Sequence, residues 1–324
     1  MKAVSTFLLA ATLACELIFP KAATAETGSS QLSEGSYAQP ELPVGRRYLG
    51  YGRLFTNDLF GDKKDRWRTG SLTSSRVWGY HWNGTLPDRL GELLELRLQG
   101  QIITPSRLTR YVPSDRRYAT AISLGLHSHA QWRGLEVSMG ADIVVIGDQT
   151  GLSSFQRELH ELVGADLPAA GILANQIGNT IRPTFVAEFG QDIQLENSNL
   201  RPFAEVRAGD ETLVRIGADL TFGGGGGELL VRESVTGQRY RVLFNEEPRW
   251  NFIIGGDVAY VEDSVYLPDN IGVDLKNNRY RLRAGVNWQG ATSSVFYGLT
   301  YLSEEFENQP EGQLVGSVRL KFEF

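Results

Sequence analysis

Hydrophobic and polar residues alternate in long runs along this chain. In the last segment, 313–324, an apolar side chain stands at nearly every second position. The polar residues between them are Ser317, Arg319, Lys321 and Glu323. Segments 92–104 and 278–289 repeat the pattern. Because successive side chains of a strand point to opposite faces, this period of two predicts strands with one apolar and one polar face.

Several of these runs extend over roughly ten residues, the length that a tilted strand needs to cross a bilayer. Strands of soluble sandwiches are usually shorter. Lipid does not tolerate unpaired strand edges, so long two-faced strands predict a closed barrel. We therefore predict an all-β fold, a transmembrane antiparallel β-barrel of about twelve strands with a short helix in an extracellular loop. The predicted strands are 49–57, 66–80, 92–104, 118–132, 133–147, 182–195, 199–209, 211–222, 248–263, 278–289, 291–306 and 313–324.

Aromatic residues fall near many predicted strand ends, as interfacial girdles require. They include Trp78, Tyr80, Trp132, Trp250, Tyr260, Trp288 and Tyr301. Segment 223–247 fits this scheme least well, because an up-and-down count puts it on the periplasmic side, where turns are short. It is either a long turn or a further hairpin around Thr236-Gly237. Its five glycines lack the Lys-Ser/Thr of a phosphate-binding loop.

The N-terminus predicts export. A lysine at position 2, an apolar run and Ala23-Thr24-Ala25 indicate a signal peptide over 1–25. The alternative is a degenerate lipobox with a lipid on Cys15. The polar, Gly/Ser/Pro-rich segment 26–45 predicts a flexible lead-in, and 46–324 the barrel. The single cysteine argues against a disulfide-stapled module. We expect a Gram-negative outer-membrane protein, monomeric, with no nucleic-acid partner.

The longest predicted outward loop, 148–181, contains "GLSSFQRELHELVG", residues 151–164. The pattern of this segment predicts an amphipathic helix. Its apolar stripe can pack on the barrel or on the lipid interface, and consists of Leu152, Phe155, Leu159 and Leu162. Gln156 and His160, four residues apart, share a different face. The other outward loops are predicted at 58–66, 105–117 and 264–277.

Two groups of polar residues could have a structural role instead of a functional one. Ser153 and Gln156 match an S-x-x-Q capping box, in which Gln156 only closes the helix start. His127 and His129 have the spacing of a metal pair on a strand, but they share their face with small and polar residues. We favour lumen-lining side chains for both histidines.

The chain resembles the outer-membrane lipid A 3′-O-deacylases over nearly its whole mature length. The resemblance rests on two segments and on the barrel that ends at Phe324. The two segments are "TNDLFGDKKDRWRTGS" (56–71) and "DIVVIGDQTGLSSFQRELHELVG" (142–164). That family has an Asn-Asp pair after the first strand, an Asp-Arg-x-x-Thr motif at the second and a Gln-x-x-x-His helix after the fifth. The matching residues are Asn57, Asp58, Asp65, Arg66, Thr69, Gln156 and His160.

The resemblance implies a Ca²⁺-dependent hydrolase that removes the 3′ ester-linked acyl chain of lipid A in lipopolysaccharide. It implies His160, Thr69 and Gln156 as catalytic residues and Asn57, Asp58 and Asp166 as metal ligands. The chemistry is compatible, since imidazole can activate water near neutral pH and a hard cation can stabilise an oxyanion. In loop 105–117, basic residues suit the phosphates of lipid A or form a solvated surface. They are Arg107, Arg110, Arg116 and Arg117.

Three departures from the family pattern leave activity open. Segment 167–179 lacks the expected aromatic, Arg68 replaces a tyrosine, and Asp166 replaces a glutamate. The alternatives are a non-catalytic barrel or porin that conducts ions, and a phospholipase with a serine nucleophile. The serines near the motifs are Ser71, Ser153 and Ser154.

Overall fold

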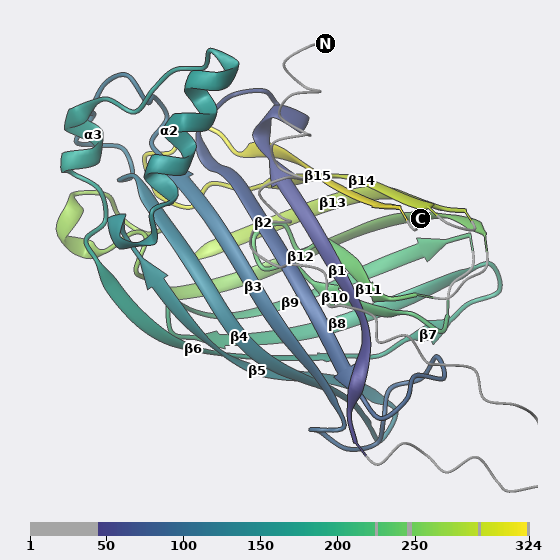
Figure 1. Cartoon of the computed structure of the whole chain (residues 1–324). Helices are drawn as coiled ribbons and strands as arrows, with labels where there is room; N and C mark the ends of the chain where they lie inside the picture. Colours follow the sequence, from purple (N-terminus) through teal and green to yellow (C-terminus); the bar gives the residue numbers. More distant parts are fainter. Residues whose placement is uncertain (1–44, 224–225, 245–247, 291–292, 323–324) are drawn as a thin grey trace, which may run out of the picture.

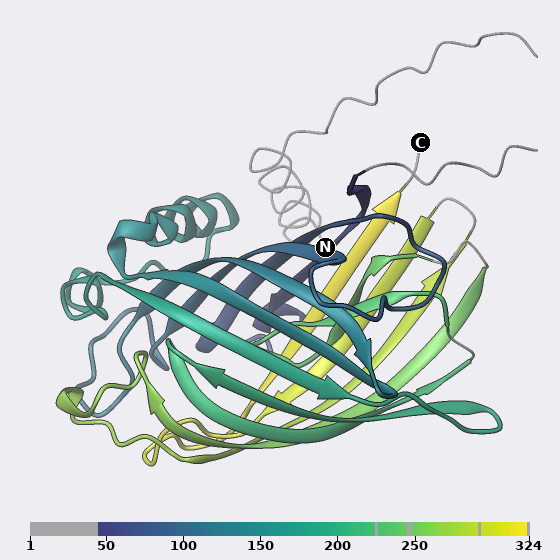
Figure 2. The same ribbon diagram turned by 90° about the horizontal axis from the view of Figure 1, so that it is seen from below.

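The computed structural model describes residues 45–223, 226–244, 248–290 and 293–322. They form an antiparallel β-barrel (Figures 1 and 2). The wall consists of β1 (Arg47–Asn57), β2 (Trp67–Gly79), β3 (Leu93–Thr104), β4 (Ala119–Trp132), β5 (Leu135–Ile146), β6 (Thr180–Gly190), β8 (Ser198–Ala208), β9 (Glu211–Phe222), β12 (Arg249–Ser264), β13 (Asn278–Gln289), β14 (Ser293–Leu302) and β15 (Gln313–Phe322). The predicted fold class is confirmed, and each of the predicted strands overlaps an observed one.

The signal peptide predicted over 1–25, the lipobox alternative at Cys15 and nearly all of the lead-in lie outside the described residues, so they stay predictions. None of the helices in the described part is long and apolar enough to cross a membrane.

The barrel closes where its first and last strands meet. Neighbouring wall strands pair in chain order, β6 pairs β8 beyond the short β7 (Ile193–Gln194), and β15 returns to β1. The β1–β15 ladder has three residue pairs in the described chain, from Phe55↔Val318 to Asn57↔Gly316, whereas β14 and β15 pair over their whole length. Beyond this junction the two strands diverge (Figure 1). The closure is therefore short.

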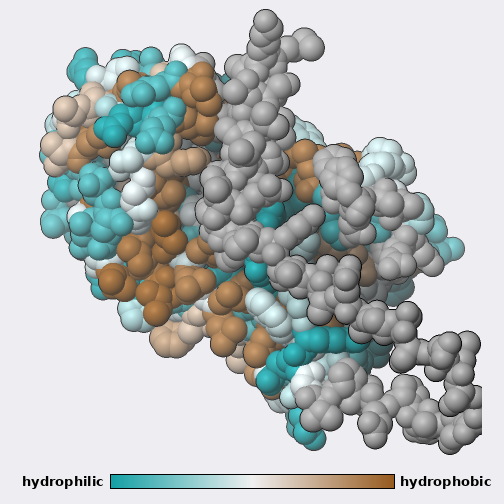
Figure 3. Space-filling model, in the orientation of Figure 1, coloured by the Kyte–Doolittle hydropathy of each residue, from teal (hydrophilic) through white to brown (hydrophobic). Residues whose placement is uncertain are grey.

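The two faces of the wall are inverted relative to a soluble protein. Many large apolar side chains are exposed on the outer face, where Figure 3 shows a hydrophobic surface. They include Leu124, Leu126, Ile143, Phe185, Ile216, Trp250, Phe252, Val258 and Leu282. Charged side chains are buried on the inner face of the same strands. This is the arrangement expected when lipid surrounds the wall.

A hairpin occupies much of the lumen. Segment 223–247 contains β10 (Leu229–Arg232) and β11 (Arg239–Leu243), joined by a turn through Thr236-Gly237, so the hairpin alternative was correct. The hairpin turn contacts the wall at two separate places, since Ser234 bonds Gln99 of β3 and Gln238 bonds Thr300 of β14. Apolar hairpin side chains pack with Leu54, Val77, Leu93 and Phe296 of the wall. The sequence alone gave no indication that the hairpin turns inward.

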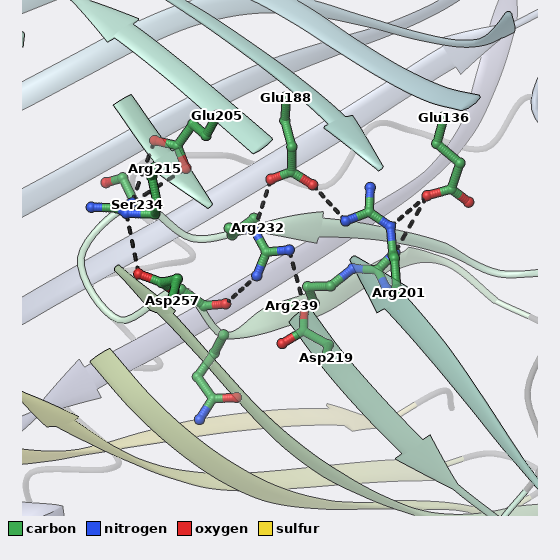
Figure 4. Close-up of polar contacts among 12 residues, drawn as sticks. Glu136, Glu188, Arg201, Glu205, Arg215, Asp219, Arg232, Ser234, Arg239 and Asp257 are labelled. Carbon is green, nitrogen blue, oxygen red and sulfur yellow. Dashed lines mark hydrogen bonds and ion pairs between the residues drawn. The ribbon is translucent and has the colours of Figure 1, made fainter. Parts of the chain in front are cut away.

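Ion pairs join the hairpin to the wall (Figure 4). Arg232 of β10 contacts Glu188 at 2.7 Å and Asp219 at 3.0 Å. Arg201 of β8 contacts the other oxygen of Glu188 at 2.7 Å and Glu136 at 2.6 Å. Buried charges are tolerated only when they are paired and hydrogen-bonded, so this network fixes the hairpin in position.

His127 and His129 belong to the lumen, as favoured from the sequence. Both are buried, and each contacts a carboxylate of its own: His127 Nε2 lies 3.2 Å from Asp142, and His129 Nε2 lies 2.7 Å from Glu95. They do not converge on one point, so the metal-pair alternative has no geometric support.

The two ends of the barrel differ. One end, here called the loop end, carries α2 (Leu152–Val163), α3 (Ala170–Ala174) and three 3₁₀ turns, η1 (Asp58–Phe60), η2 (Asp148–Thr150) and η3 (Asp269–Ile271). At the opposite end, here called the terminal end, β1 begins and β15 finishes (Figure 2).

We expect no steady ion current through the wild-type barrel, because the hairpin and its ion pairs occupy the lumen. A twelve-stranded barrel without such an insert is wider than eight-stranded barrels that side chains alone can fill. Replacing 228–244 with a short Gly-Ser linker should therefore produce stepwise conductance in planar bilayers. A steady channel in the wild type would contradict this prediction and support a porin.

Gly52 is expected to be intolerant of any side chain. A Cβ there would lie 2.2 Å from the carbonyl oxygen of Arg241 on the hairpin. Gly52→Ala should therefore lower the unfolding free energy by about 1–3 kcal/mol, seen as a lower melting temperature in detergent. Gly178→Ala is the matched control, since a Cβ at Gly178 meets nothing within 4 Å. Equal melting temperatures for the two variants would contradict the close packing.

Candidate functional site

The predicted site residues of the first loop lie where β1 and β2 reach the loop end. Asn57 is the last residue of β1, and its side-chain oxygen accepts a hydrogen bond from the Leu59 amide at 2.9 Å. Its side-chain amide donates to the Thr69 carbonyl at 2.8 Å. Asn57 thereby caps η1 and ties it to β2, which holds Asp58 beside Thr69.

Asp58 and Asp65 form an acidic pair. The Asp58 carboxylate is 4% exposed and accepts the Arg66 amide at 3.1 Å. The Thr69 hydroxyl donates to Asp65 at 2.6 Å. Burial, together with the nearby Asp65 charge, raises the pKa of Asp58 to about 8. The neighbouring Asp62 is neutralised by Arg66 at 3.0 Å, whereas no cationic side chain of the described residues forms an ion pair with Asp58.

A distortion at the start of β2 orients Thr69. Trp67 has a φ of +52°, which is rare for a bulky residue, and the register with β3 shifts between Trp67 and Gly70. Trp67 is fully buried, and the Arg66 guanidinium lies over its ring at 4.1 Å. As a result, both Arg68 and Thr69 are buried, where a regular strand would turn one of them outward.

His160 reaches the acidic pair from α2. The helix ends at Gly164, which has a φ of +71°, and this turn brings the chain back under the histidine. The Asp166 main-chain carbonyl lies 2.6 Å from His160 Nδ1. Because a carbonyl only accepts, Nδ1 carries the proton and Nε2 has a free lone pair in the neutral ring. Nε2 lies 3.5 Å from the Asp65 carboxylate.

The polar face of α2 is the one that packs on the barrel. Gln156 is buried and accepts a hydrogen bond from the Tyr118 hydroxyl at 2.7 Å, so it does not close the helix start, where Gly151 is the cap. The capping-box alternative is therefore wrong. Phe155 and Leu162 of the apolar stripe are exposed.

The predicted phosphate-binding arginines separate into two groups. Arg107 and Arg110 are exposed at the loop end. Arg116, in contrast, is 1% exposed and pairs with Glu305, which also binds Arg68 at 2.7 Å. The expectation of a surface loop residue is thus wrong for Arg116, because the chain between β3 and β4 turns this side chain inward.

The donor set around Asp58 fits a hard cation such as Ca²⁺. The site offers the carboxylates of Asp58 and Asp65 and the hydroxyl of Thr69, which are oxygen donors of the kind Ca²⁺ prefers. Asp58 has no cationic partner among the described residues. The described residues contain no group of three or more His, Cys, Asp or Glu side chains that could hold a metal. Further ligands would thus be main-chain oxygens or water. The Asp166 side chain is exposed, and within the described part of the chain Asp166 contacts the site through its main-chain carbonyl.

The candidate serine nucleophiles lack a base. Ser153 donates to Asp148 at 2.8 Å, and Ser154 is exposed. Ser71 is buried without a hydrogen-bond partner. No hydrogen bond joins any of the three to a histidine in the described chain.

Sequence reasoning gave Asp65, Tyr118 and Glu305 no site role. Asp65 stands in the matched motif four residues before Thr69, and that spacing is the signal that could have assigned it. Tyr118 and Glu305 have no such signal, because their contacts depend on how distant loops meet.

Comparison with known proteins assigns the family. A family model described as outer membrane protein LpxR matches residues 24–324. LpxR from Salmonella typhimurium has a solved structure that is 18% identical, with a TM-score of 0.70, covering 85% of this chain and 100% of that one. The β domain of the Bordetella autotransporter BrkA is 10% identical, covering 86% and 99%, but its TM-score of 0.38 supports no argument. No curated protein matches. Since the family model spans nearly its whole length, the chain belongs to the LpxR family of outer-membrane proteins.

Proposed function

We propose that this protein is an outer-membrane lipid A deacylase that hydrolyses the 3′ ester-linked acyl chain of lipid A. The observation that carries the proposal is the position of His160. Its Nδ1 is held by the Asp166 carbonyl, and its Nε2 faces the Asp65–Thr69 pair beside Asp58. A base, a hydroxyl and an acidic pair from three separate segments thus meet at one end of a membrane barrel.

His160 is the general base in this proposal. Its Nε2 takes a proton from a water molecule, and the resulting hydroxide attacks the ester carbonyl. When the tetrahedral intermediate collapses, the imidazolium returns the proton to the leaving sugar oxygen, giving a free fatty acid and a hydroxyl. The Asp65 carboxylate, 3.5 Å from Nε2, stabilises the imidazolium, while the Thr69 hydroxyl holds Asp65 in place. Gln156, anchored by Tyr118, positions the helix face that carries the base.

Asp58 and Asp65 would hold Ca²⁺, with Asn57 fixing the turn that presents Asp58. When bound, the ion would supply positive charge for the oxyanion of the intermediate. It would also offset the repulsion between the buried Asp58 carboxylate and the partly exposed Asp65 carboxylate.

The surroundings suit an amphiphilic substrate in the outer leaflet. Phe155 and Leu162 are 42% and 63% exposed on α2, and such apolar side chains are suited to insertion into the lipid interface. Arg107 and Arg110 are exposed at the same end and can bind lipid A phosphates. Lipopolysaccharide and the bilayer are the partners that this surface requires.

Replacing His160 with alanine is expected to reduce deacylation by a factor of about 10²–10⁴, because the reaction loses its base. Mass spectrometry of lipid A from cells that express each variant measures the loss of the 3′ chain. Glu161→Ala, which alters the exposed neighbouring position of α2, should retain activity. Unchanged lipid A in wild-type cells, or full activity of His160→Ala, would disprove the proposal.

Calcium affinity is expected to rise with pH up to about 8. The pKa of Asp58 is raised to about 8, so below this pH a bound proton must leave before the carboxylate can bind the ion. The apparent affinity should fall about tenfold per pH unit below pH 8, measured by calorimetric Ca²⁺ titration. Without metal, stability should decrease as pH rises from about 4 to about 8 and level off above that, because in this range the carboxyl is ionised in the unfolded chain but protonated in the folded one. Ca²⁺ should restore the lost stability. An affinity that does not vary between pH 6 and pH 8, or an unchanged affinity in Asp58→Asn, would argue against this site.

A further inference from the structure

A cavity lies in the lumen toward the terminal end, away from the candidate active site. Its volume is about 390 Å³, at the small end of the range for ligand pockets. It lies between the β10–β11 hairpin and the inner face of the wall, and it reaches the turns of the terminal end at Trp82 and Gly134. Arginines outnumber acidic residues in its lining, seven to five.

Most of these arginines are neutralised. Arg201 lies near three carboxylates and Arg232 near two (Figure 4 shows both arginines). Arg97 pairs with Glu95, and Arg207 pairs with Asp210. The remaining three are Arg239, which is 4.0 Å from Glu136, and Arg241 and Arg319.

Arg319 on β15 is one source of this excess. The residue is 5% exposed and lines the cavity, yet it forms no ion pair with any described carboxylate. Its single hydrogen bond in the described chain goes from Nη2 to the Ser294 hydroxyl at 2.7 Å, and the guanidinium lies 4.9 Å from the Phe244 ring. The remaining donors of a planar guanidinium suit an oxyanion.

Arg241 on the hairpin adds to the charge. It contacts Glu228 at 2.6 Å, but Glu228 also pairs with Arg249. Among the described residues, Arg241 and Arg249 thus share one carboxylate and Arg319 has none. The other donors of Arg241 bond the neutral side chains of Gln289 and Asn251, so they do not compensate its charge. Burial of uncompensated charge is costly, so an anion in the cavity would stabilise this end of the barrel.

An unpartnered donor faces the same region. Asn287 lines the cavity, is 4% exposed, and its side-chain Nδ2 has no hydrogen-bond partner. It is level with Phe296 and Arg319 on three adjacent strands, since Asn287 pairs Phe296 and Phe296 pairs Arg319. Buried donors are rarely left unsatisfied, so this amide indicates a missing acceptor.

We propose that this cavity binds the phosphate group of a small ligand that enters from the terminal end. Arg319 and Arg241 supply the charge, and the Asn287 amide supplies a neutral donor to a phosphate oxygen. A free phosphate and a glycerophosphate headgroup share this chemistry. The site is separate from the proposed catalytic residues and does not depend on the proposed deacylase activity.

The test is a calorimetric titration of the full-length protein in detergent. Inorganic phosphate and glycerol 3-phosphate are the two probes, and saturable binding of either supports the proposal and identifies the source. Arg319→Gln should weaken binding about tenfold or more, because a charged hydrogen-bonding partner is lost. Arg133→Gln, which removes an exposed arginine from a turn at the terminal end, is the control for non-specific attraction and should bind as the wild type does.

A second variant covers the case in which Arg319→Gln does not fold. Asn287→Asp puts a negative charge in place of the free amide and should abolish binding, while circular dichroism reports the barrel. Absence of saturable binding in the folded wild type up to about 10 mM would overturn the proposal. Equal affinity in Arg133→Gln and in a folded Arg319→Gln or Asn287→Asp would overturn it as well.

Discussion

Ion pairing inside the lumen is the interaction on which the rest of this structure depends. Lipid outside the wall forces the apolar side chains outward, so the charged side chains of the same strands must be buried inside. There they are stable only with partners, and Arg232 of the hairpin supplies a partner to Glu188 and Asp219. The hairpin is therefore part of the electrostatic framework of the wall. Because this framework is rigid, the strand ends at the loop end are fixed in relative position.

The candidate site uses that rigidity. Asp58 directly follows β1 and Thr69 lies near the start of the paired β2. The Asn57 side chain joins η1 to β2, because it bonds the Leu59 amide and the Thr69 carbonyl. His160 comes from α2 in the loop between β5 and β6, and this helix is held by the buried Gln156–Tyr118 contact and by the Asp166 carbonyl. The chemistry of the site thus depends mainly on short-range geometry that the barrel imposes.

The strands could be predicted because one face meets lipid and the other does not, which imposes a strict period of two on the sequence. The meeting of His160 with the Asn57–Thr69 segment came from a resemblance, since no periodicity reports contacts between distant loops. The inward turn of the hairpin and of Arg116 could not be predicted, because a buried, paired arginine and an exposed one look the same in sequence. The sequence also left open which face of α2 packs on the barrel, since an apolar stripe can contact either the wall or the lipid.

The short junction between β1 and β15 has a consequence for how the barrel stays closed. Only three residue pairs join the two end strands in the described chain. The hairpin strand β11 packs on Gly50 and Gly52 of β1, and Phe244, the next residue after β11, lies beside Arg319 and Lys321 of β15. The segment inside the barrel thus contacts both end strands, so the contents of the barrel act as an internal clasp across its seam.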